Sequence, residues 1–308
     1  MRIAFGLLAI LAIGSSAAIA YGAQKAKPVL TVFRANVGFV NSSGSDSKPG
    51  TFDAASSSAV LVPADYDGDG RIDAATWKAV TGKWQVLRSS DSTKITFDLG
   101  RRSTKTGANQ DVPVPADFDG DGRTDIAVWR SATGTWQILP SSKNYEHSAM
   151  TVSRWGSAGD VPVQADYDGD AKADLAVFRP SENRWYILES KTGETRTENF
   201  GIAGTDLLVP TDYTGDGKAD IAVYRKGTWL VLNSETGETE PFEFGFADAR
   251  PVPADYDNDG EIDFAVYRRG TWYVYESGSP RFLTYKFGSE TDTPLCSTIA
   301  KQSIAGLQ

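Results

Sequence analysis

The feature that most restricts the fold of this chain is a nine-residue acidic motif that recurs at intervals of 52, 49, 46 and 43 residues. Its five copies begin at Asp65, Asp117, Asp166, Asp212 and Asp255. Each copy is followed by two short runs rich in β-branched and aromatic residues, and then by a third run such as KITFDLG. With the run that precedes the motif, each repeat has four expected strands. Four strands at this period predict a β-propeller blade, and hence an all-β fold.

The two ends of the chain decide the expected number of blades. Residues 30–56 match strands two to four of a blade, but they have no first strand and no acidic motif. At the other end, FGSETDTPLCST aligns with FGFADARPVPAD and so supplies a first strand. The sequence therefore predicts six four-stranded blades, closed by pairing N-terminal strands with a C-terminal strand, which removes exposed edges. The propeller is expected over 28–300, with blades at 28–56 plus 293–300, 59–100, 112–156, 161–201, 207–245 and 251–288, and a tail at 301–308.

The N-terminal segment resembles an export signal. Residues 1–20 combine Arg2 with an apolar run and end in Ala18-Ile19-Ala20, a small-x-small pattern typical of signal peptidase sites. We therefore expect a signal peptide at 1–20 and a secreted, cell-surface or periplasmic protein. The alternative is an uncleaved anchor, because residues 3–23 carry no charge and could span a bilayer. After signal removal, no stable membrane insertion is expected.

Composition excludes several kinds of site. The chain has one cysteine, Cys296, and one histidine, His147, so an intramolecular disulfide and a zinc site with several histidines are both excluded. Cys296 is expected in a packed strand, and His147 in a solvated loop. The net charge of −9 argues against a nucleic-acid partner, because such partners require basic surfaces.

The acidic motif has the oxygen pattern of a calcium loop. In D-x-D-x-D-G-x-x-D, side chains at positions 1, 3, 5 and 9 and a backbone carbonyl at position 7 suit a hard cation, while Gly at position 6 allows a sharp turn. The expected cofactor is Ca²⁺, up to five ions, and Mg²⁺ is the weaker candidate. Position 12 lies inside an expected strand in every copy, which excludes an EF-hand. The expected metal residues are Asp65, Asp67, Asp69, Arg71, Asp73, Asp117, Asp119, Asp121, Arg123, Asp125, Asp166, Asp168, Asp170, Lys172, Asp174, Asp212, Thr214, Asp216, Lys218, Asp220, Asp255, Asp257, Asp259, Glu261 and Asp263.

These motifs resemble the FG-GAP and VCBS repeats found in integrin α-subunits and in many exported bacterial proteins. The resemblance rests on the acidic loop, on PVPAD, and on FG at 200–201, 244–245 and 287–288. It implies a calcium-binding propeller, frequently used in adhesion or recognition. Two loops depart from the pattern: Ala171 replaces Gly in the third, and Thr214 replaces Asp in the fourth. Those two loops are expected to bind calcium less tightly. Integrin propellers also have seven blades, whereas six are predicted here.

Two further repeat positions have both a functional and a structural interpretation. A tryptophan recurs on strand three, and a basic residue recurs at the end of strand two. A lectin could stack sugars on the tryptophans and bind sugar hydroxyls with the basic residues. The buried contacts expected between blades nevertheless favour a packing role for the tryptophans. For the arginines, a structural role near the loop carboxylates is favoured. The two sets are Trp84, Trp136, Trp185, Trp229 and Trp272, and Lys78, Arg130, Arg179, Arg225 and Arg268.

The function predicted from the sequence is that of an exported, calcium-binding recognition, adhesion or structural scaffold. A lectin-like glycan-binding propeller is the alternative, and a calcium-dependent hydrolase or polysaccharide lyase ranks below both. No enzyme activity and no catalytic residue are predicted, because no polar cluster interrupts the repeat. The ligand, protein or glycan, is expected on the face away from the metals, where inter-blade loops such as the one containing Lys105, Thr106 and Asn109 vary in length.

Overall fold

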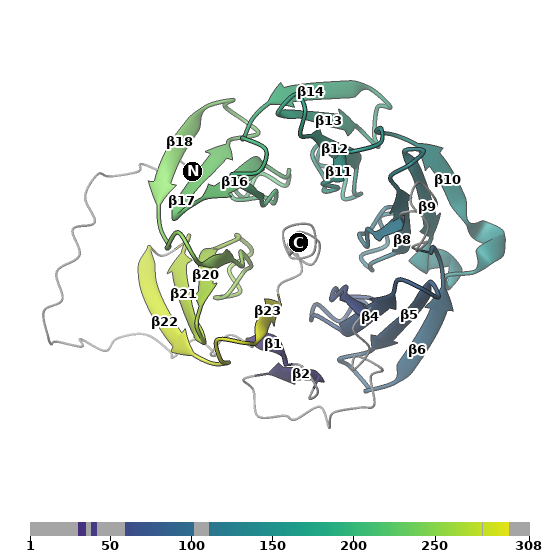
Figure 1. The fold of residues 1–308 in the computed structure, drawn as a ribbon, viewed down its shortest axis with the longest axis horizontal. Helices are drawn as coiled ribbons and strands as arrows, with labels where there is room; N and C mark the ends of the chain where they lie inside the picture. The colour runs from purple at the N-terminus through teal and green to yellow at the C-terminus, as the bar shows by residue number, and fades with distance from the viewer. Residues whose placement is uncertain (1–29, 35–37, 42–58, 102–110, 279, 296–308) are drawn as a thin grey trace, which may run out of the picture.

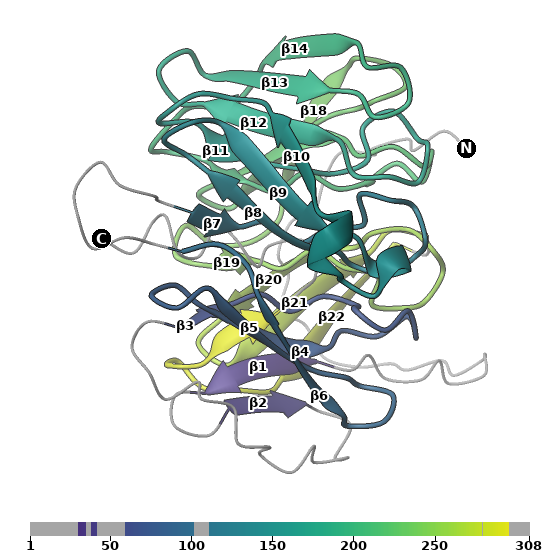
Figure 2. The same cartoon turned by 90° about the vertical axis from the view of Figure 1, so that its right-hand side faces the viewer.

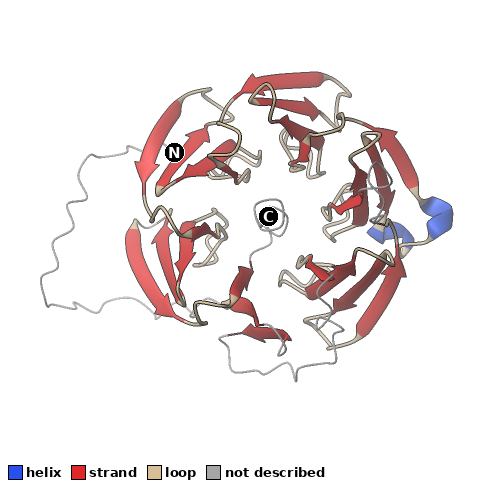
Figure 3. Ribbon diagram, viewed as in Figure 1, coloured by secondary structure: helices blue, strands red, loops and turns tan. Residues whose placement is uncertain are grey.

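The strands form sheets arranged around a common centre, as the blades of a β-propeller (Figure 1). The structure is a computed structural model, and it describes residues 30–34, 38–41, 59–101, 111–278 and 280–295. Seen from the side, each sheet lies next to its neighbour in the ring (Figure 2). Apart from two short 3-10 helices, η2 (Ser141–Lys143) and η3 (His147–Ala149), the described chain consists of strands and loops (Figure 3). None of its helices is long enough to cross a bilayer.

Five sheets have four antiparallel strands each, and the first strand in sequence lies innermost. The five consist, from the inner strand outward, of β3 (Ala59–Leu61), β4 (Ala74–Lys78), β5 (Lys83–Leu87) and β6 (Lys94–Asp98); β7 (Asp111–Pro113), β8 (Ile126–Arg130), β9 (Thr135–Leu139) and β10 (Thr151–Arg154); β11 (Val161–Pro162), β12 (Leu175–Arg179), β13 (Arg184–Leu188) and β14 (Thr195–Asn199); β15 (Leu207–Leu208), β16 (Ile221–Arg225), β17 (Thr228–Leu232) and β18 (Thr239–Glu243); and β19 (Arg250–Pro251), β20 (Phe264–Arg268), β21 (Thr271–Glu276) and β22 (Arg281–Lys286). We number them blades 1 to 5. Prolines fit the innermost strands because one edge of each is unpaired.

The sixth sheet differs from the prediction. It has three described strands in the order β2 (Gly38–Asn41), β1 (Thr31–Arg34) and β23 (Thr293–Leu295), and β1 pairs antiparallel with β23. The prediction of six four-stranded blades is therefore corrected to five, plus this three-stranded sheet. The outer strand expected near residue 52 lies outside the described residues, as do the predicted signal peptide at 1–20, Cys296 and the tail at 301–308.

The hydrophobic core is divided among the contacts between neighbouring blades. One cluster joins Trp84 and Val86 of blade 1 to Val128 and Leu139 of blade 2, and corresponding clusters join the later neighbours. A further cluster joins blade 5 to Val32 of the three-stranded sheet. Because each blade packs its faces on its neighbours, the alternating apolar residues of the inner and middle strands are buried.

The FG dipeptide follows the outermost strand and is hydrogen-bonded to the tryptophan on the third strand of the same blade. In blade 3 the indole Nε1 of Trp185 donates a hydrogen bond to the carbonyl oxygen of Phe200 at 3.0 Å, and blades 4 and 5 repeat this bond. The glycine that follows has a positive φ, +131° at Gly245, where an added Cβ would strike the Tyr224 ring. Glycine is therefore required at this position by both conformation and space.

Candidate metal centre

The five acidic loops connect the innermost strand of each blade to the second. In four of them an isolated antiparallel bridge, such as Ala64↔Asp73, joins the two ends of the loop. The next blade also holds the loop: the amide of Thr124 in loop 2 donates to the carbonyl of Asp65 in loop 1 at 2.8 Å, and the same bond joins loops 2 and 3 and loops 3 and 4. The loops thus lie close together around the centre of the ring.

The carboxylate at position 1 folds its own loop. In loop 1, Asp65 accepts hydrogen bonds from the amides of Gly68 at 2.6 Å and Gly70 at 2.8 Å, one on each oxygen. The other four loops make equivalent bonds. This arrangement turns the chain back on itself and brings later carboxylates towards the first. The glycines have positive φ, as the tight turn requires.

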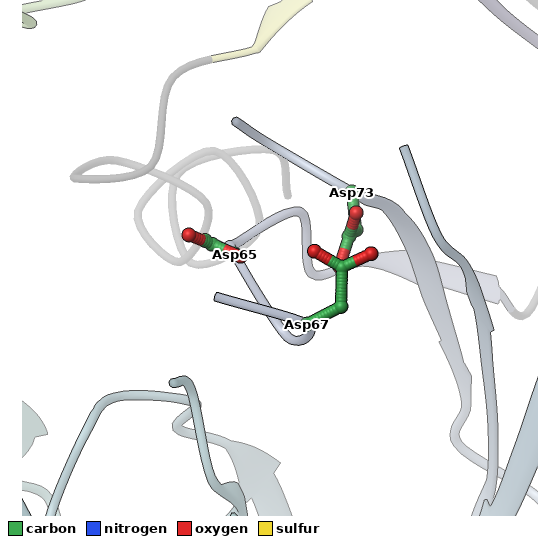
Figure 4. Close-up of side chains that lie close together, drawn as sticks. All are labelled: Asp65, Asp67 and Asp73. Carbon is green, nitrogen blue, oxygen red and sulfur yellow. The ribbon is translucent and has the colours of Figure 1, made fainter. Parts of the chain in front are cut away.

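Four of the five loops bring three carboxylates together. Oxygens of Asp65, Asp67 and Asp73 lie within 4.8 Å of one another, as the close-up of loop 1 illustrates (Figure 4). Loops 2 and 3 gather positions 1, 3 and 9 in the same way, whereas loop 5 gathers positions 1, 3 and 5. The three remaining groups are Asp117, Asp119 and Asp125; Asp166, Asp168 and Asp174; and Asp255, Asp257 and Asp259.

Position 9 is buried in all five loops. Asp125 is fully buried, and its carboxylate accepts hydrogen bonds from the backbone amides of Phe118 at 2.8 Å and Ser141 at 2.7 Å. Burial nevertheless raises the pKa of this carboxyl to about 6, and the same cause acts on Asp73, Asp174 and Asp263. A charged carboxylate is therefore costly here without a nearby cation.

Position 3 has buried oxygens without a hydrogen-bond partner in two of the described loops. Asp119 Oδ1 and Asp168 Oδ1 are buried and have no hydrogen-bond partner among the described residues. Buried polar atoms normally have a partner, so each such oxygen needs an explanation. The side chains in these groups offer only carboxylate oxygens to a metal ion, and these are the ligand atoms that Ca²⁺ and Mg²⁺ prefer. The residues present therefore fit a hard divalent cation.

Positions 5 and 7 are arranged differently from the sequence expectation. Asp69 and Asp121 form ion pairs with the position 7 arginines of their own loops, Arg71 and Arg123, at 2.8 and 2.6 Å. In loops 1 to 3 the group of three does not include the position 5 carboxylate. The position 7 side chain also covers the preceding loop, because the stem of Arg123 lies where a Cβ on Gly68 would be. Lys172, Lys218 and Glu261 pack in the same way over Gly120, Gly169 and Gly215.

The two loops that depart from the motif have different outcomes. Ala171 adopts φ +66°, a conformation that favours glycine, yet loop 3 still gathers three carboxylates. Loop 4, with Thr214 at position 3, is not among the groups of three found in the described chain. Its Asp212, Asp216 and Asp220 are each held by hydrogen bonds within the blade.

A recurring serine at the end of strand three was missed by the sequence analysis. Its amide donates to the position 9 carboxylate in all five blades, and in four its hydroxyl donates to position 5, as Ser89 does to Asp69 at 2.8 Å. The signal was present, because serine stands two residues beyond the expected strand in LRS, LPS, LES and LNS. The serines are Ser89, Ser141, Ser190, Ser234 and Ser277.

The recurring aromatic and basic residues are both structural. The five tryptophans are at most 1% exposed, so none of them can stack on a sugar. The predicted partners of the arginines were wrong: Arg130 pairs with Asp111 at 2.8 Å, at the start of the same blade rather than in an acidic loop. Arg179 and Arg225 pair equivalently with Asp160 and Asp206. Arg268 pairs with Asp248, which stands one residue earlier in its repeat and is half exposed. His147 is exposed, as expected.

Comparison with known structures supports the class of protein that this fold defines, a β-propeller. TolB from Acinetobacter baumannii aligns with a TM-score of 0.54 and 14% identity over 88% of this chain and 67% of TolB. A lectin from Agrocybe aegerita that recognises non-reducing terminal N-acetylglucosamine gives 0.53 and 15%, over 85% and 76%. Virginiamycin B lyase from Staphylococcus aureus gives 0.48 and 11%, over 76% and 72%, too distant a likeness to bear on function.

The sequence comparison then identifies the repeat. Residues 117–177 and 166–223 match the model of the FG-GAP-like repeat. Residues 117–223 are thus identified as FG-GAP-like repeats, as the sequence motifs predicted. No curated protein sequence matches it.

Proposed function

We propose that this protein is a calcium-stabilised recognition scaffold that acts outside the cytoplasm. The observation that carries the proposal is the repeated group of three carboxylates, two of which contain a buried oxygen without a partner among the described residues. Residues at positions 1, 3 and 9 would hold the ion. Bound Ca²⁺ would neutralise the carboxylates, while the hydrogen bonds of positions 1 and 9 keep the loop folded. No enzyme activity is proposed.

Calcium binding by single-loop variants tests the metal sites. We expect Asp119→Ala to remove one bound ion per chain, because it deletes the position 3 ligand of loop 2. Asp216→Ala should change the stoichiometry less, since loop 4 lacks a carboxylate at position 3 and Asp216 already accepts a hydrogen bond from Ser234. The measurement is calorimetric titration with Ca²⁺. Equal losses from the two variants would contradict this order of affinities.

A glycan ligand is the second candidate, and one surface favours it. Between the outer strands of blades 4 and 5, Phe242 and Phe244 stack at 5.9 Å, and Phe282 lies 6.0 Å from Phe244 and 6.3 Å from Tyr273. Phe282 is 56% exposed. Exposed aromatic faces can stack on the apolar faces of sugars. The tryptophans proposed for this role from the sequence are buried, so this cluster is the better candidate.

A glycan array, run with and without calcium, distinguishes the two candidates. If the aromatic surface binds sugars, Phe282→Ala should abolish every positive signal. Val152→Ala is the matched control, because Val152 is equally exposed on the outer strand of blade 2. An array without signals, or signals that survive Phe282→Ala, would remove this site and leave the protein ligand as the proposal. The expected docking face away from the metals stays a prediction, since Lys105, Thr106 and Asn109 lie outside the described residues.

We also infer that the three-stranded sheet is the sixth blade and closes the ring. Arg34 makes three hydrogen bonds of 2.7 to 3.2 Å with Asp292 across β1 and β23. This pair corresponds to Arg130–Asp111, which lies within one continuous blade. The two chain ends therefore supply the two halves of an ion pair that single blades make internally.

Breaking that pair should reveal its contribution to stability. Asp292 has a fully buried side chain, so Asp292→Asn should lower the free energy of unfolding by about 1.5–3 kcal/mol, a range typical of hydrogen bonds to charged groups. Asp248→Asn is the control, because the Asp248 side chain is 49% exposed and its pair should contribute less than about 1 kcal/mol. Urea unfolding measures both. Equal destabilisation would argue against a special role for the joined ends.

A further inference from the structure

Neighbouring acidic loops are joined at residues that lie beside the proposed metal ligands. The backbone carbonyl of Asp65, at position 1 of loop 1, accepts a hydrogen bond from the amide of Thr124 at 2.8 Å. Thr124 lies between positions 7 and 9 of loop 2, Arg123 and Asp125. The stem of Arg123 also packs over Gly68 of loop 1. The backbone of each loop therefore restricts the backbone of the other.

The segment 140–150, which connects the third and fourth strands of blade 2, contacts two proposed ligands of loop 2. The hydroxyl of Ser142 donates to Asp119 Oδ2 at 2.6 Å, and the amide of Ser141 donates to Asp125 Oδ1 at 2.7 Å. The other oxygen of Asp119 is buried without a partner among the described residues, so it is available to an ion. The position of this segment thus depends on how positions 3 and 9 of loop 2 are arranged.

Tyr145 extends from the same segment to loop 1. Its hydroxyl donates to the carbonyl of Tyr66 at 2.9 Å and to that of Thr124 at 3.1 Å, so one proton is shared between the two loops. Tyr66 lies between positions 1 and 3 of loop 1, and its amide donates to the position 9 carboxylate, Asp73, at 2.9 Å. Tyr145 therefore holds the part of the backbone that lies between two proposed ligands of loop 1.

Blade 2 differs from the other four-stranded blades in this segment. The corresponding connections are shorter and contain no aromatic residue. They are 88–93, 189–194, 233–238 and 277–280.

The backbone at Tyr145 is strained. Asn144 and Tyr145 have φ of +52° and +59°, and a positive φ is unusual for a bulky side chain. Such a conformation persists only where the surrounding contacts fix it. Here the Tyr145 ring is buried, and its centroid lies 4.5 Å from that of the Phe97 ring of blade 1. Packing between the blades thus holds the Tyr145 hydroxyl at loop 1.

We propose that loops 1 and 2 bind calcium cooperatively and that Tyr145 is the positioning residue that couples them. The inference rests on the proposed function, because it requires both loops to hold an ion. Without a cation, the like charges in each group repel one another and favour an open loop. When Asp119 and Asp125 hold an ion, their contacts order the 140–150 segment, and Tyr145 in turn orders the backbone of loop 1 at Tyr66. Loop 1 then loses less conformational freedom on binding its own ion, and linkage makes the effect reciprocal.

NMR with glycine-selective ¹⁵N labelling tests the coupling, because it reports on each loop separately. The amide of Gly70 donates to Asp65 in loop 1 and that of Gly122 donates to Asp117 in loop 2, so each signal should shift as its own loop fills with Ca²⁺. We expect Asp119→Ala, which blocks loop 2, to weaken the calcium binding reported by Gly70 about tenfold, within the range typical of coupled sites.

Asp257→Ala is the matched control at position 3. It blocks loop 5, which the three-stranded sheet separates from blade 1 in the ring (Figure 1), so it should leave the affinity of loop 1 unchanged. If calcium shifts neither glycine signal in the unaltered protein, the metal loops and the proposed function both fail. If both signals shift but Asp119→Ala leaves the affinity of loop 1 unchanged, or Asp257→Ala lowers it equally, calcium binding stands and the coupling is overturned.

Tyr145→Phe tests the coupling residue, because it removes the hydroxyl and keeps the ring against Phe97. In this background, Asp119→Ala should weaken loop 1 about threefold or less instead of about tenfold. Tyr186→Phe is the matched control, since the Tyr186 hydroxyl donates to Glu182 in blade 3. If Tyr145→Phe leaves the effect of Asp119→Ala unchanged, or Tyr186→Phe reduces it equally, Tyr145 is rejected as the coupling residue.

Discussion

Excess chelator is expected to lower the melting temperature of this protein by roughly 12 °C or more. Each calcium site at about ten times its dissociation constant adds about 1.4 kcal/mol to stability, so the four loops with a group of three carboxylates would add about 6 kcal/mol. That is comparable with the whole stability of a typical domain. For a chain of this size, one kcal/mol corresponds to roughly 2–4 °C. The reason for so large a dependence is that the loops concentrate buried carboxylates with no disulfide to hold them.

Differential scanning calorimetry with metal add-back makes this result specific. Calcium should restore the melting temperature, and magnesium should restore little of it, since Mg²⁺ requires tighter octahedral geometry and retains its waters. An unchanged melting temperature in chelator would exclude a structural role for the metal. Equal recovery with both ions would retain a cation site but not its selectivity.

Acidification should have opposite effects on the metal-free and calcium-loaded protein. The position 9 carboxyls Asp73, Asp125, Asp174 and Asp263 have pKa values raised by burial to about 6, compared with about 3.9 in an unfolded chain. Between these values the folded metal-free state binds more protons than the unfolded state. Its stability should therefore rise as the pH falls from 7 to 4.5, by on the order of 2 kcal/mol per carboxyl. With calcium, protons compete for the ligands and stability should fall.

Thermal melts from pH 7.5 to 4.5, with and without calcium, measure both slopes. Asp292 should not contribute to either, because its hydrogen bond to Arg34 lowers its pKa and keeps it ionised in this range. Burial also raises the pKa values of Asp220 and Asp117. Asp125→Asn removes one of the titrating carboxyls and should reduce the metal-free slope by no more than about a quarter. Parallel pH profiles for the two forms would show that the position 9 carboxyls are not coupled to metal binding.

The sequence predicted the features that recur at short range. The strand runs, the inner position of the proline-containing strands, the two-residue turn at Lys226-Gly227 with both φ values positive, and the acidic loops all follow from local patterns. The burial of the tryptophans was also expected, since a large residue repeated on one strand suits packing between blades.

What the sequence did not predict depends on contacts between distant residues. Ser141 reaches Asp125 only when strand three returns beside the loop, and the arginine partners depend on strand register, which pairs Arg130 with Asp111. The arginine at position 7 neutralises position 5 because the loop turns back within two residues, a geometry that the spacing alone does not reveal. The outer strand of the sixth sheet lies outside the described residues, so its prediction is untested.

The pairing of β1 with β23 also affects the order in which the molecule can form during synthesis. Arg34 and Asp292 are 258 residues apart in the chain, so β1 has no partner on this side until the ribosome has passed residue 293. Each acidic blade pairs its strands over short separations and can assemble as its own hairpins emerge, whereas contacts between distant residues form slowly. Until residues 293–295 are available, β1 keeps an open edge on this side, and open edges are sites of incorrect pairing with other chains. A strand synthesised long after β1 is thus the one that covers its edge.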